Sequence, residues 1–445
     1  MPESPLPAGL ADTLERRLAT AQADERLPSV SAAVFRDGAV VWERALGLAD
    51  VGGVVAATPG HQYRIGSITK TFTAVAVMQL REAGRLDLDA PVRSLLPEFP
   101  PGPTFRQALC HLSGLQREPP GEMWETMDPP DREALVAGLE DAERVLRPGR
   151  AWHYSNLVFG LLGEVVARAT GSYEATLRER ILDPLGLRRT RLRPEPPCAT
   201  PYFVDPWSDA IRVEPGPDAT ESTAAIGWLW STPSDLARWG DFLCTGHDGV
   251  LGREALDEMA RLQVMVDEAA WTVGWGLGLG LYRRGDRVYV GHGGAMPGFL
   301  AGALVHRPQR TGAVVLTNTG AGASPDALAL DLAEAALDAF VRIPDPWRPD
   351  GGAPAEAAPL LGAWWTEGSQ LLVTWSGGRL RVELVGGSEG RNVSWLEQEA
   401  DDRWRVSEGR ELGELLRVVR GEGGAVAKLY FATYPVTREP STFGA

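Results

Sequence analysis

The stretch from Arg64 to Phe72 constrains this chain more than any other. It reads Arg-Ile-Gly-Ser-Ile-Thr-Lys-Thr-Phe, so Ser67 and Lys70 are three residues apart. On a helix this spacing places both side chains on one face, about one turn apart. The residues from Ser67 to about Ala83 are apolar nearly all round, which predicts a buried helix. Gly66 permits a sharp turn, so Ser67 is expected at the helix N-terminus, where the dipole favours a developing negative charge.

The use of lysine in the chain gives Lys70 added weight. Positive charge is carried almost entirely by arginine, and Lys70 and Lys428 are the only lysines. Arginine keeps its proton near neutral pH, whereas a buried lysine can lose it. A neutral amine could then take the proton of the Ser67 hydroxyl as that hydroxyl attacks a carbonyl. Ser-x-x-Lys also occurs by chance on many helices, so the motif needs support from elsewhere.

Two later motifs supply that support. Tyr154-Ser155-Asn156 precedes an apolar helical run, and His292-Gly293-Gly294 follows a strand-like run. The order S-x-x-K, Y-x-N, H-x-G resembles the serine β-lactamase and penicillin-binding-protein superfamily. The likeness is to its class C-like branch of esterases, D-amino-acid peptidases and peptide-cyclising thioesterases, and most of all to stand-alone penicillin-binding-protein-type thioesterases. His111-Leu112-Ser113-Gly114-Leu115 resembles that branch's H-T-S-G-L segment, and the whole resemblance covers about residues 8 to 341.

Composition limits the partners. The net charge of −15 and the pI near 5.0 argue against nucleic acid or an anionic membrane as a partner. The three cysteines and six histidines show no metal-ligand spacing, so we expect no metal and no cofactor. Residues 1–10 have neither a basic nor an apolar signal region, and no apolar run could span a bilayer. These observations predict a cytoplasmic protein.

The hydrophobic pattern predicts an α+β fold. Strand-like runs lie near both ends of residues 1–341, with helical patterns between them. The predicted elements are a helix over 8–23, a hairpin of strands 30–35 and 40–45, helices over 131–145, 157–169 and 234–243, four strands between 272 and 318, and a closing helix over 325–340. They indicate one antiparallel sheet flanked by helices, with a helical subdomain beside it and the site between them. The resemblance implies the same β-lactamase/transpeptidase-like fold.

The remainder of the chain predicts a second domain. Residues 342–359 are dense in Pro, Gly and Ala and read as a linker after the catalytic domain of residues 1–341. Residues 360–445 contain six short strand-like runs, at 371–375, 379–385, 393–396, 404–406, 415–419 and 428–431. We expect a small all-β, barrel-like domain, which resembles the lipocalin-like domain of some class C-like members. It could be a stabilising appendage or a wall over the active-site cleft.

The chemistry centres on Ser67 as the nucleophile. Either Lys70 or Tyr154 could remove its proton, and the sequence leaves the choice open. Asn156 is expected to hydrogen-bond Lys70 or the acyl amide of the substrate. His292 stands where many relatives carry the lysine of K-T-G, and it could bind a substrate carboxylate or Tyr154.

Backbone groups complete the expected site. By resemblance, the oxyanion hole would be formed by the backbone N–H groups of Ser67 and Ala295. Gly293 and Gly294 would let a substrate backbone approach the strand closely. Trp228 and Trp230 are expected to contact the substrate.

The predicted function is that of a serine acyl-enzyme hydrolase or acyltransferase. Absence of a signal, H-x-G in place of K-T-G and the C-terminal β domain favour a thioesterase that releases and cyclises a nonribosomal peptide through acyl-Ser67. Its substrate would be a peptidyl ester, thioester or amide, with delivery by a carrier protein left open. An esterase or D-amino-acid-specific peptidase is the alternative, and a catalytically silent binding protein is a third.

Overall fold

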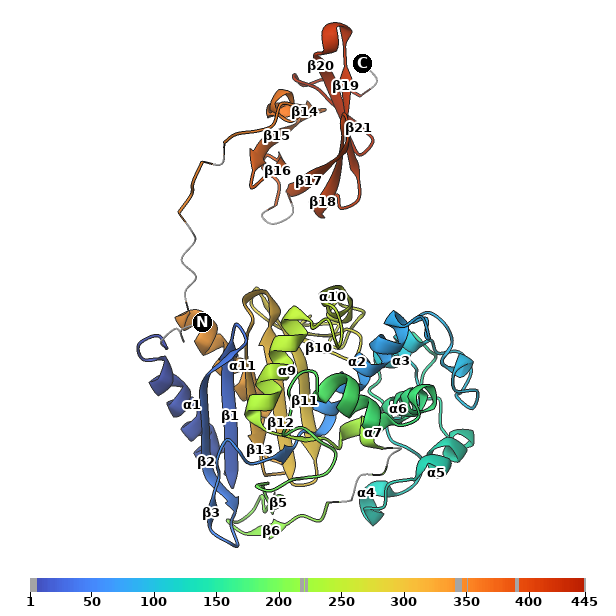
Figure 1. The fold of residues 1–445 in the computed structure, drawn as a ribbon, viewed down its shortest axis with the longest axis vertical. Coiled ribbons are helices and arrows are strands. Elements are labelled where there is room, and N and C mark those ends of the chain that lie inside the picture. The colour runs from blue at the N-terminus through green and yellow to red at the C-terminus, as the bar shows by residue number, and fades with distance from the viewer. Residues whose placement is uncertain are drawn as a thin grey trace. The chain divides into compact units, whose positions relative to one another are not determined.

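The computed structural model describes residues 6–216, 220, 223–340, 346–349, 351–388 and 392–443. Contacts divide the chain into two compact units, Met1–Val341 and Arg342–Ala445 (Figure 1). Of the predicted linker, residues 342–345 and 350 lie outside the described residues. Ala357 is fully buried in the core of the second unit, so that core begins within the segment predicted as linker.

The first unit is built on a nine-stranded antiparallel sheet. Its order is β3-β2-β1-β13-β12-β11-β10-β9-β8, so strands from the two ends of the unit meet where β1 pairs with β13. The strands are β1 (Ser29–Arg36), β2 (Ala39–Asp50), β3 (Val55–Ala56), β8 (Val264–Met265), β9 (Val273–Trp275), β10 (Gly280–Arg284), β11 (Arg287–Met296), β12 (Phe299–His306) and β13 (Thr311–Thr317). The predicted sheet is confirmed.

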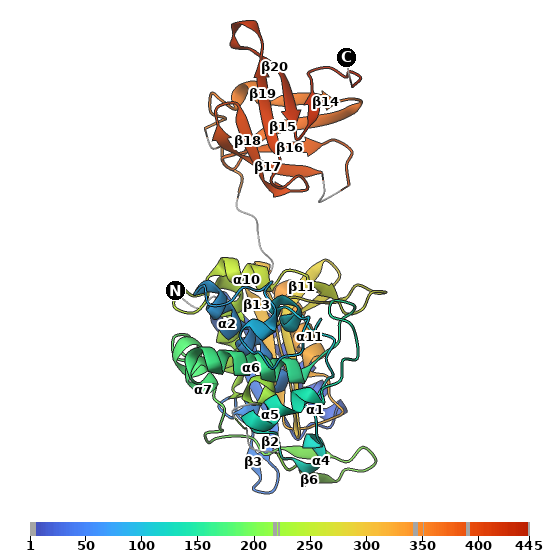
Figure 2. The ribbon, with the colours of Figure 1, turned by 90° about the vertical axis from the view of Figure 1, so that its right-hand side faces the viewer.

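Helices cover both faces of this sheet (Figures 1 and 2). On one face α1 (Leu10–Asp24) and α11 (Pro325–Ala339) share a core with β1 and β13. On the other face α9 (Pro233–Thr245) packs on the sheet, and α2 (Thr69–Glu82) and α6 (Asn156–Thr170) belong to the same large core. The α+β fold predicted from the sequence is therefore confirmed.

Short elements connect these helices. They are α3 (Phe105–Leu109), α4 (Met123–Thr126), α5 (Arg132–Ala137), α7 (Tyr173–Leu177), α8 (Ala224–Gly227), α10 (Arg253–Met259) and the small strand pairs β4 (Tyr63–Arg64) with β7 (Trp230–Ser231) and β5 (Tyr202–Val204) with β6 (Ile211–Val213). The helix predicted over 131–145 is shorter than expected. After α5 only a 3₁₀ turn, Gly138–Glu140, continues it, because glycine weakens a helix interior.

The second unit is an eight-stranded antiparallel meander. Its strands are β14 (Gly362–Thr366), β15 (Ser369–Ser376), β16 (Arg379–Leu384), β17 (Val393–Ala400), β18 (Arg403–Gly409), β19 (Leu415–Arg420), β20 (Val426–Phe431) and β21 (Tyr434–Val436). Reciprocal backbone hydrogen bonds of 2.7 and 2.9 Å between Trp365 and Thr437 bring the first strand to the chain beyond the last. The predicted barrel-like domain is confirmed, with β14 and β21 added to the six predicted strands.

Three further features concern the described residues alone. None of their helices is both long enough and apolar enough to cross a membrane. Their His, Cys, Asp and Glu side chains form no group of three that could hold a metal ion. Cys110, Cys198 and Cys244 are free thiols.

Candidate active site

Ser67 lies where two backbone segments pack directly on each other. It occupies the 3₁₀ turn Gly66–Ile68 that leads into α2. Gly66 has φ +51°, and a Cβ there would lie 2.4 Å from the backbone nitrogen of Ala295 on β11. A Cβ on Gly294 would lie 2.0 Å from the carbonyl oxygen of Ile65. Both positions therefore require glycine, and the contact places the two predicted oxyanion-hole residues on adjoining segments.

Lys70 is fully buried one turn along from Ser67. Its Nζ donates hydrogen bonds to Ser67 Oγ at 2.9 Å and to the carbonyl oxygen of Ile226 at 2.7 Å. Burial holds the pKa of Lys70 well below its ordinary value, with Glu118 raising this pKa and Arg117 lowering it to smaller extents. The favoured form is a neutral amine, which can accept a proton.

Tyr154 closes the other side of Ser67. Its phenol shares a side-chain hydrogen bond with Ser67, and the guanidinium of Arg117 lies 4.9 Å from its ring centroid. Burial raises the pKa of Tyr154 well above its ordinary value, and the Ser67 hydrogen bond and Arg117 lower it to smaller extents. The phenol therefore holds its proton at neutral pH. Lys70 and Tyr154, between which the sequence could not choose as the base, therefore differ: burial favours the neutral amine of Lys70 and the protonated phenol of Tyr154.

Asn156 hydrogen-bonds Glu118 and not Lys70, while the other expected partner, the acyl amide of the substrate, stays a prediction. Its Nδ2 donates to Glu118 Oε1 at 2.7 Å, while Ile226 accepts the second hydrogen bond of Lys70. Asn156 Oδ1 is buried and has no partner among the described residues. Glu118 was missed from the sequence, since it lies in an irregular segment with no motif around it. The backbone carbonyl of Arg117 fixes that segment by accepting from the Asn156 N–H at 2.6 Å.

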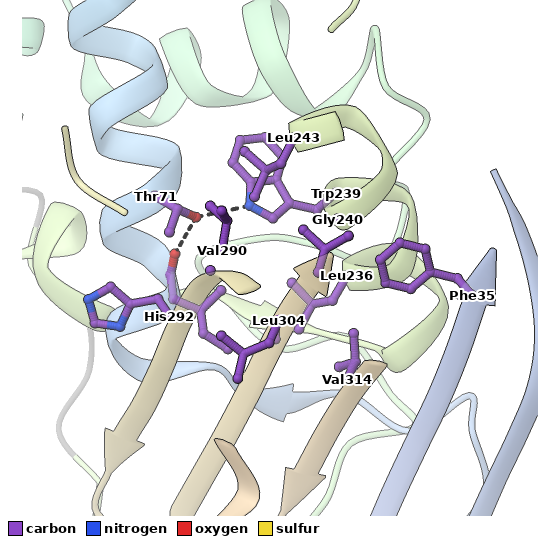
Figure 3. A pocket seen from close by; sticks show the side chains of 14 residues that line it. Phe35, Thr71, Leu236, Trp239, Gly240, Leu243, Val290, His292, Leu304 and Val314 are labelled. Carbon is purple, nitrogen blue, oxygen red and sulfur yellow. Dashed lines mark hydrogen bonds between the residues drawn. The ribbon is translucent and has the colours of Figure 1, made fainter. Parts of the chain in front are cut away.

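His292 lies on β11 at the wall of the cleft, and its side chain is 5% exposed. Nδ1 donates to the carbonyl oxygen of Gly293, so Nε2 carries the lone pair and has no partner in the described part of the chain. Burial, and then the proximity of Lys70, lower the pKa of His292 to about 3. In Figure 3 its ring points away from the apolar side chains of Val290 and Leu304.

A cleft of about 790 Å³ opens over Ser67. Its walls include Tyr154, Asn156, Trp275, His292 and the β11 backbone through Ala295. The cavity drawn in Figure 3 is a different feature of only about 10 Å³, enclosed by apolar side chains behind α2. There Trp239 Nε1 donates to Thr71 Oγ1 at 2.9 Å and anchors the helix that carries Lys70.

The strand β11 has a free edge in this cleft. Its pairing with β10 ends at Gly291, whereas its pairing with β12 continues to Met296. Among the strands that the structure describes, β12 alone therefore pairs with residues 292–296. An extended peptide could add to this edge through backbone hydrogen bonds.

Trp228 and Trp230 do not line the cleft. They are 2% and 6% exposed, and the guanidinium of Arg64 lies 5.0 and 5.2 Å from their ring centroids. Trp230 also packs edge-on against Phe299. Their expected contact with substrate is therefore corrected: these residues support the sheet and helix around the site. A tryptophan side chain can be buried in the core or can line a binding site, and the sequence does not distinguish these two positions.

Comparison with known proteins agrees with this geometry. A family model described as Beta-lactamase matches residues 14–338, and one described as Domain of unknown function (DUF7586) matches residues 353–438. Penicillin-binding protein 4 of Amycolatopsis lactamdurans is 29% identical over 383 residues, covering 80% of this chain and 97% of that protein. Esterase EstB of Burkholderia gladioli is 32% identical over 231 residues, covering 47% of this chain and 58% of the esterase.

Solved structures are similar as well. The structure of SurE with D-Leu aligns with a TM-score of 0.60 at 28% identity, covering 97% of this chain and 100% of that one. The D-stereospecific amidohydrolase from Streptomyces sp. aligns with a TM-score of 0.62 at 28% identity, covering 73% of this chain and 98% of that one. Because the family match spans most of the chain and the fold agrees with it, this protein belongs to the beta-lactamase family, in the superfamily of serine hydrolases that includes the penicillin-binding proteins.

Proposed function

We propose that the protein transfers acyl groups through an ester formed on Ser67. The observation that carries the proposal is the 2.9 Å hydrogen bond from the fully buried Lys70 Nζ to Ser67 Oγ. A serine hydroxyl is a weak nucleophile until a base takes its proton. A neutral amine at this distance is such a base once the hydroxyl hydrogen of Ser67 turns toward the Nζ lone pair, which then accepts it. The acyl donor is a peptidyl thioester, ester or amide.

In the acylation step, Ser67 Oγ attacks the carbonyl carbon and its proton passes to Lys70. We assign the base to Lys70, since burial favours its neutral amine and keeps the Tyr154 phenol protonated. The tetrahedral oxyanion is held by the backbone N–H groups of Ser67 and Ala295. When the bond to the leaving group breaks, Tyr154 donates a proton to the departing atom and regains one from the Lys70 ammonium.

In the second step an amine or water attacks acyl-Ser67, and Ser67 recovers its proton as the new bond forms. For the acceptor we propose the free amine at the other end of the same peptide, which makes the reaction a head-to-tail cyclisation. The likeness to SurE, which extends over both units and includes a structure with D-Leu, supports a substrate that contains a D-residue. The neutral His292, in place of a lysine, further favours a substrate without a carboxylate at that position.

The second candidate is hydrolysis of small esters or D-amino-acid amides. It is supported by the likeness to Esterase EstB and to the D-stereospecific amidohydrolase. Chemistry at Ser67 is the same in both candidates, and the outcome depends on whether an amine or water reaches the acyl-enzyme first.

The test is a product analysis with a peptidyl pantetheine thioester that ends in a D-residue and has a free N-terminal amine. Pantetheine supplies the leaving thiol that a carrier protein would otherwise supply. Cyclisation gives a product one water lighter than the linear acid, absent with Ser67→Ala. Linear acid alone would overturn cyclisation in favour of hydrolysis. Equal activity of Ser67→Ala and the wild type would overturn the assignment of Ser67, and a binding protein without catalysis would then be the remaining interpretation.

A further inference from the structure

The charged side chains that line the cleft are mostly acidic. Among the described residues around it, Arg117 is the one with a fixed positive charge, and Glu118, Glu214 and Asp326 are acidic. Arg117 Nε lies 3.4 Å from Glu118 Oε1, so these two charges offset each other. The remaining carboxyl groups, together with the neutral His292, leave a cleft that attracts cations and repels carboxylates.

Asp326 lies over Gly293 of β11, on the face of the sheet that α11 covers, whereas the neighbouring Gly294 faces Ile65 on the opposite side. It lies in the first turn of α11, which packs on the cross-strand pair of Gly293 and Gly302. A Cβ on Gly302 would lie 2.6 Å from Asp326 Cα, so only glycine allows the helix to sit this close. A Cβ on Gly293 would lie 3.9 Å from Asp326 Oδ2, which places the carboxyl group alongside Gly293. Asp326 and Ser67 both line the cleft.

Two buried side chains point independently to a ligand rich in hydrogen-bond donors. His292 and Asn156 are 5% and 8% exposed, and both line the cleft. His292 Nε2 and Asn156 Oδ1 have no partner among the described residues, and the hydrogen bonds made by the other polar atoms of these side chains leave both as acceptors. A buried acceptor without a partner is costly, so a ligand that donates N–H groups here would be stabilised.

We propose that the substrate carries an ammonium group that binds Asp326, in the same cleft as Ser67. This inference rests on the acyl transfer proposed above and adds its substrate class: acyl donors with a lysine-like cationic side chain at the residue that bears the carbonyl. N–H groups of the same segment donate to His292 Nε2 and Asn156 Oδ1. A donor with a carboxylate in place of the ammonium group is excluded by charge.

The test compares three peptidyl thioesters that differ only in their last residue, which is D-lysine, D-norleucine or D-glutamate. The lysine substrate should exceed the norleucine substrate by about tenfold or more in kcat/KM, mainly through KM, and the glutamate substrate should be the poorest. Asp326→Asn should bring the ratio of kcat/KM for the lysine and norleucine substrates down toward one. The matched control is Asp12→Asn, which removes an exposed carboxylate from the first turn of α1, away from the cleft, and should keep the preference.

Any other result would refute either the ammonium site or the proposed acyl transfer. Equal rates for lysine and norleucine, with Ser67 acylated by both, would refute the ammonium site and leave the proposed acyl transfer standing. An equal loss for all three substrates in Asp326→Asn would show that this residue only supports the helix, and would also refute the site. Failure of all three substrates to acylate wild-type Ser67 would refute the proposed function itself.

Discussion

Replacing Lys70 with methionine tests whether a neutral amine activates Ser67. Methionine keeps an unbranched chain in the buried position and removes Nζ with its hydrogen bonds to Ser67 Oγ and to the carbonyl of Ile226. A positioned general base contributes about 10²–10⁴ to a rate. We therefore expect acylation of Ser67 to slow by about that factor in Lys70→Met.

The same substitution should leave folding nearly unchanged. Burial lowers the pKa of Lys70, so between the lowered pKa and the ordinary value of 10.5 the unfolded chain binds a proton that the folded chain lacks. In this range Lys70 reduces stability, and the reduction is relieved as pH rises toward 10.5. Methionine removes this cost and also two hydrogen bonds, each worth about 1 kcal/mol. These two effects on the unfolding free energy act in opposite directions, so we expect Lys70→Met to fold.

The assay is the pre-steady-state release of a chromophore from an activated ester, with urea unfolding in parallel. Lys428→Met is the control, since it removes the other lysine, which lies on β20. Because the chain has two lysines, ¹⁵N-lysine NMR can follow each amine and measure the Lys70 pKa directly. A Lys70→Met rate within twofold of the wild type, or a Lys70 amine that titrates at its ordinary pKa, would refute the reasoning.

Three further predictions concern the surrounding residues. Tyr154→Phe keeps the ring but loses the bond to Ser67, so turnover should fall by about 10²–10⁴ without loss of thermal stability; a normal rate would remove the phenol from the mechanism. Gly66→Ala should abolish acylation, since its Cβ would lie 2.4 Å from Ala295 nitrogen, whereas Gly84→Ala, also at positive φ but with open space around it, should keep activity; equal effects would contradict the packing argument. The pKa of His292 is lowered to about 3, so between pH 6.5 and 3 the unfolded chain binds a proton that the folded chain lacks, and the free energy of unfolding falls with acid by up to about 5 kcal/mol. His292→Gln should flatten this pH dependence in urea titrations from pH 7 to 4. An unchanged slope would contradict the prediction.

Local patterns predicted most of the fold. The apolar run that includes Ser67 and Lys70 predicted a buried helix, and most residues of α2 are indeed buried in the core. Two barrel strands were missed for reasons of local chemistry. β14 follows the Pro- and Gly-rich segment, and the three-residue β21 contains Pro435, which local patterns disfavour in a strand. Each pairs with its neighbour in sequence, β14 with β15 and β21 with β20, and the long-range contact is the bridge between Trp365 and Thr437.

The candidate site was predictable where short spacings determine it. The three spacings among Ser67, Lys70, Tyr154 and His292 identified four side chains that the fold gathers around one cleft; Lys70 lies just beneath it. The partner of Asn156 and the burial of Trp228 depend on which distant segments fold against them, so local sequence cannot supply them. The choice of base follows from burial in the folded state, since isolated lysine and tyrosine have similar pKa values.

The most direct test of the central claim is intact-protein mass spectrometry after brief incubation with an activated D-peptidyl ester, followed by peptide mapping. The account predicts a mass increase equal to the acyl group, located on Ser67, absent in Ser67→Ala and formed far more slowly in Lys70→Met. Turnover of the ester without any adduct on Ser67 in quenched samples, together with undiminished turnover by Ser67→Ala, would contradict it.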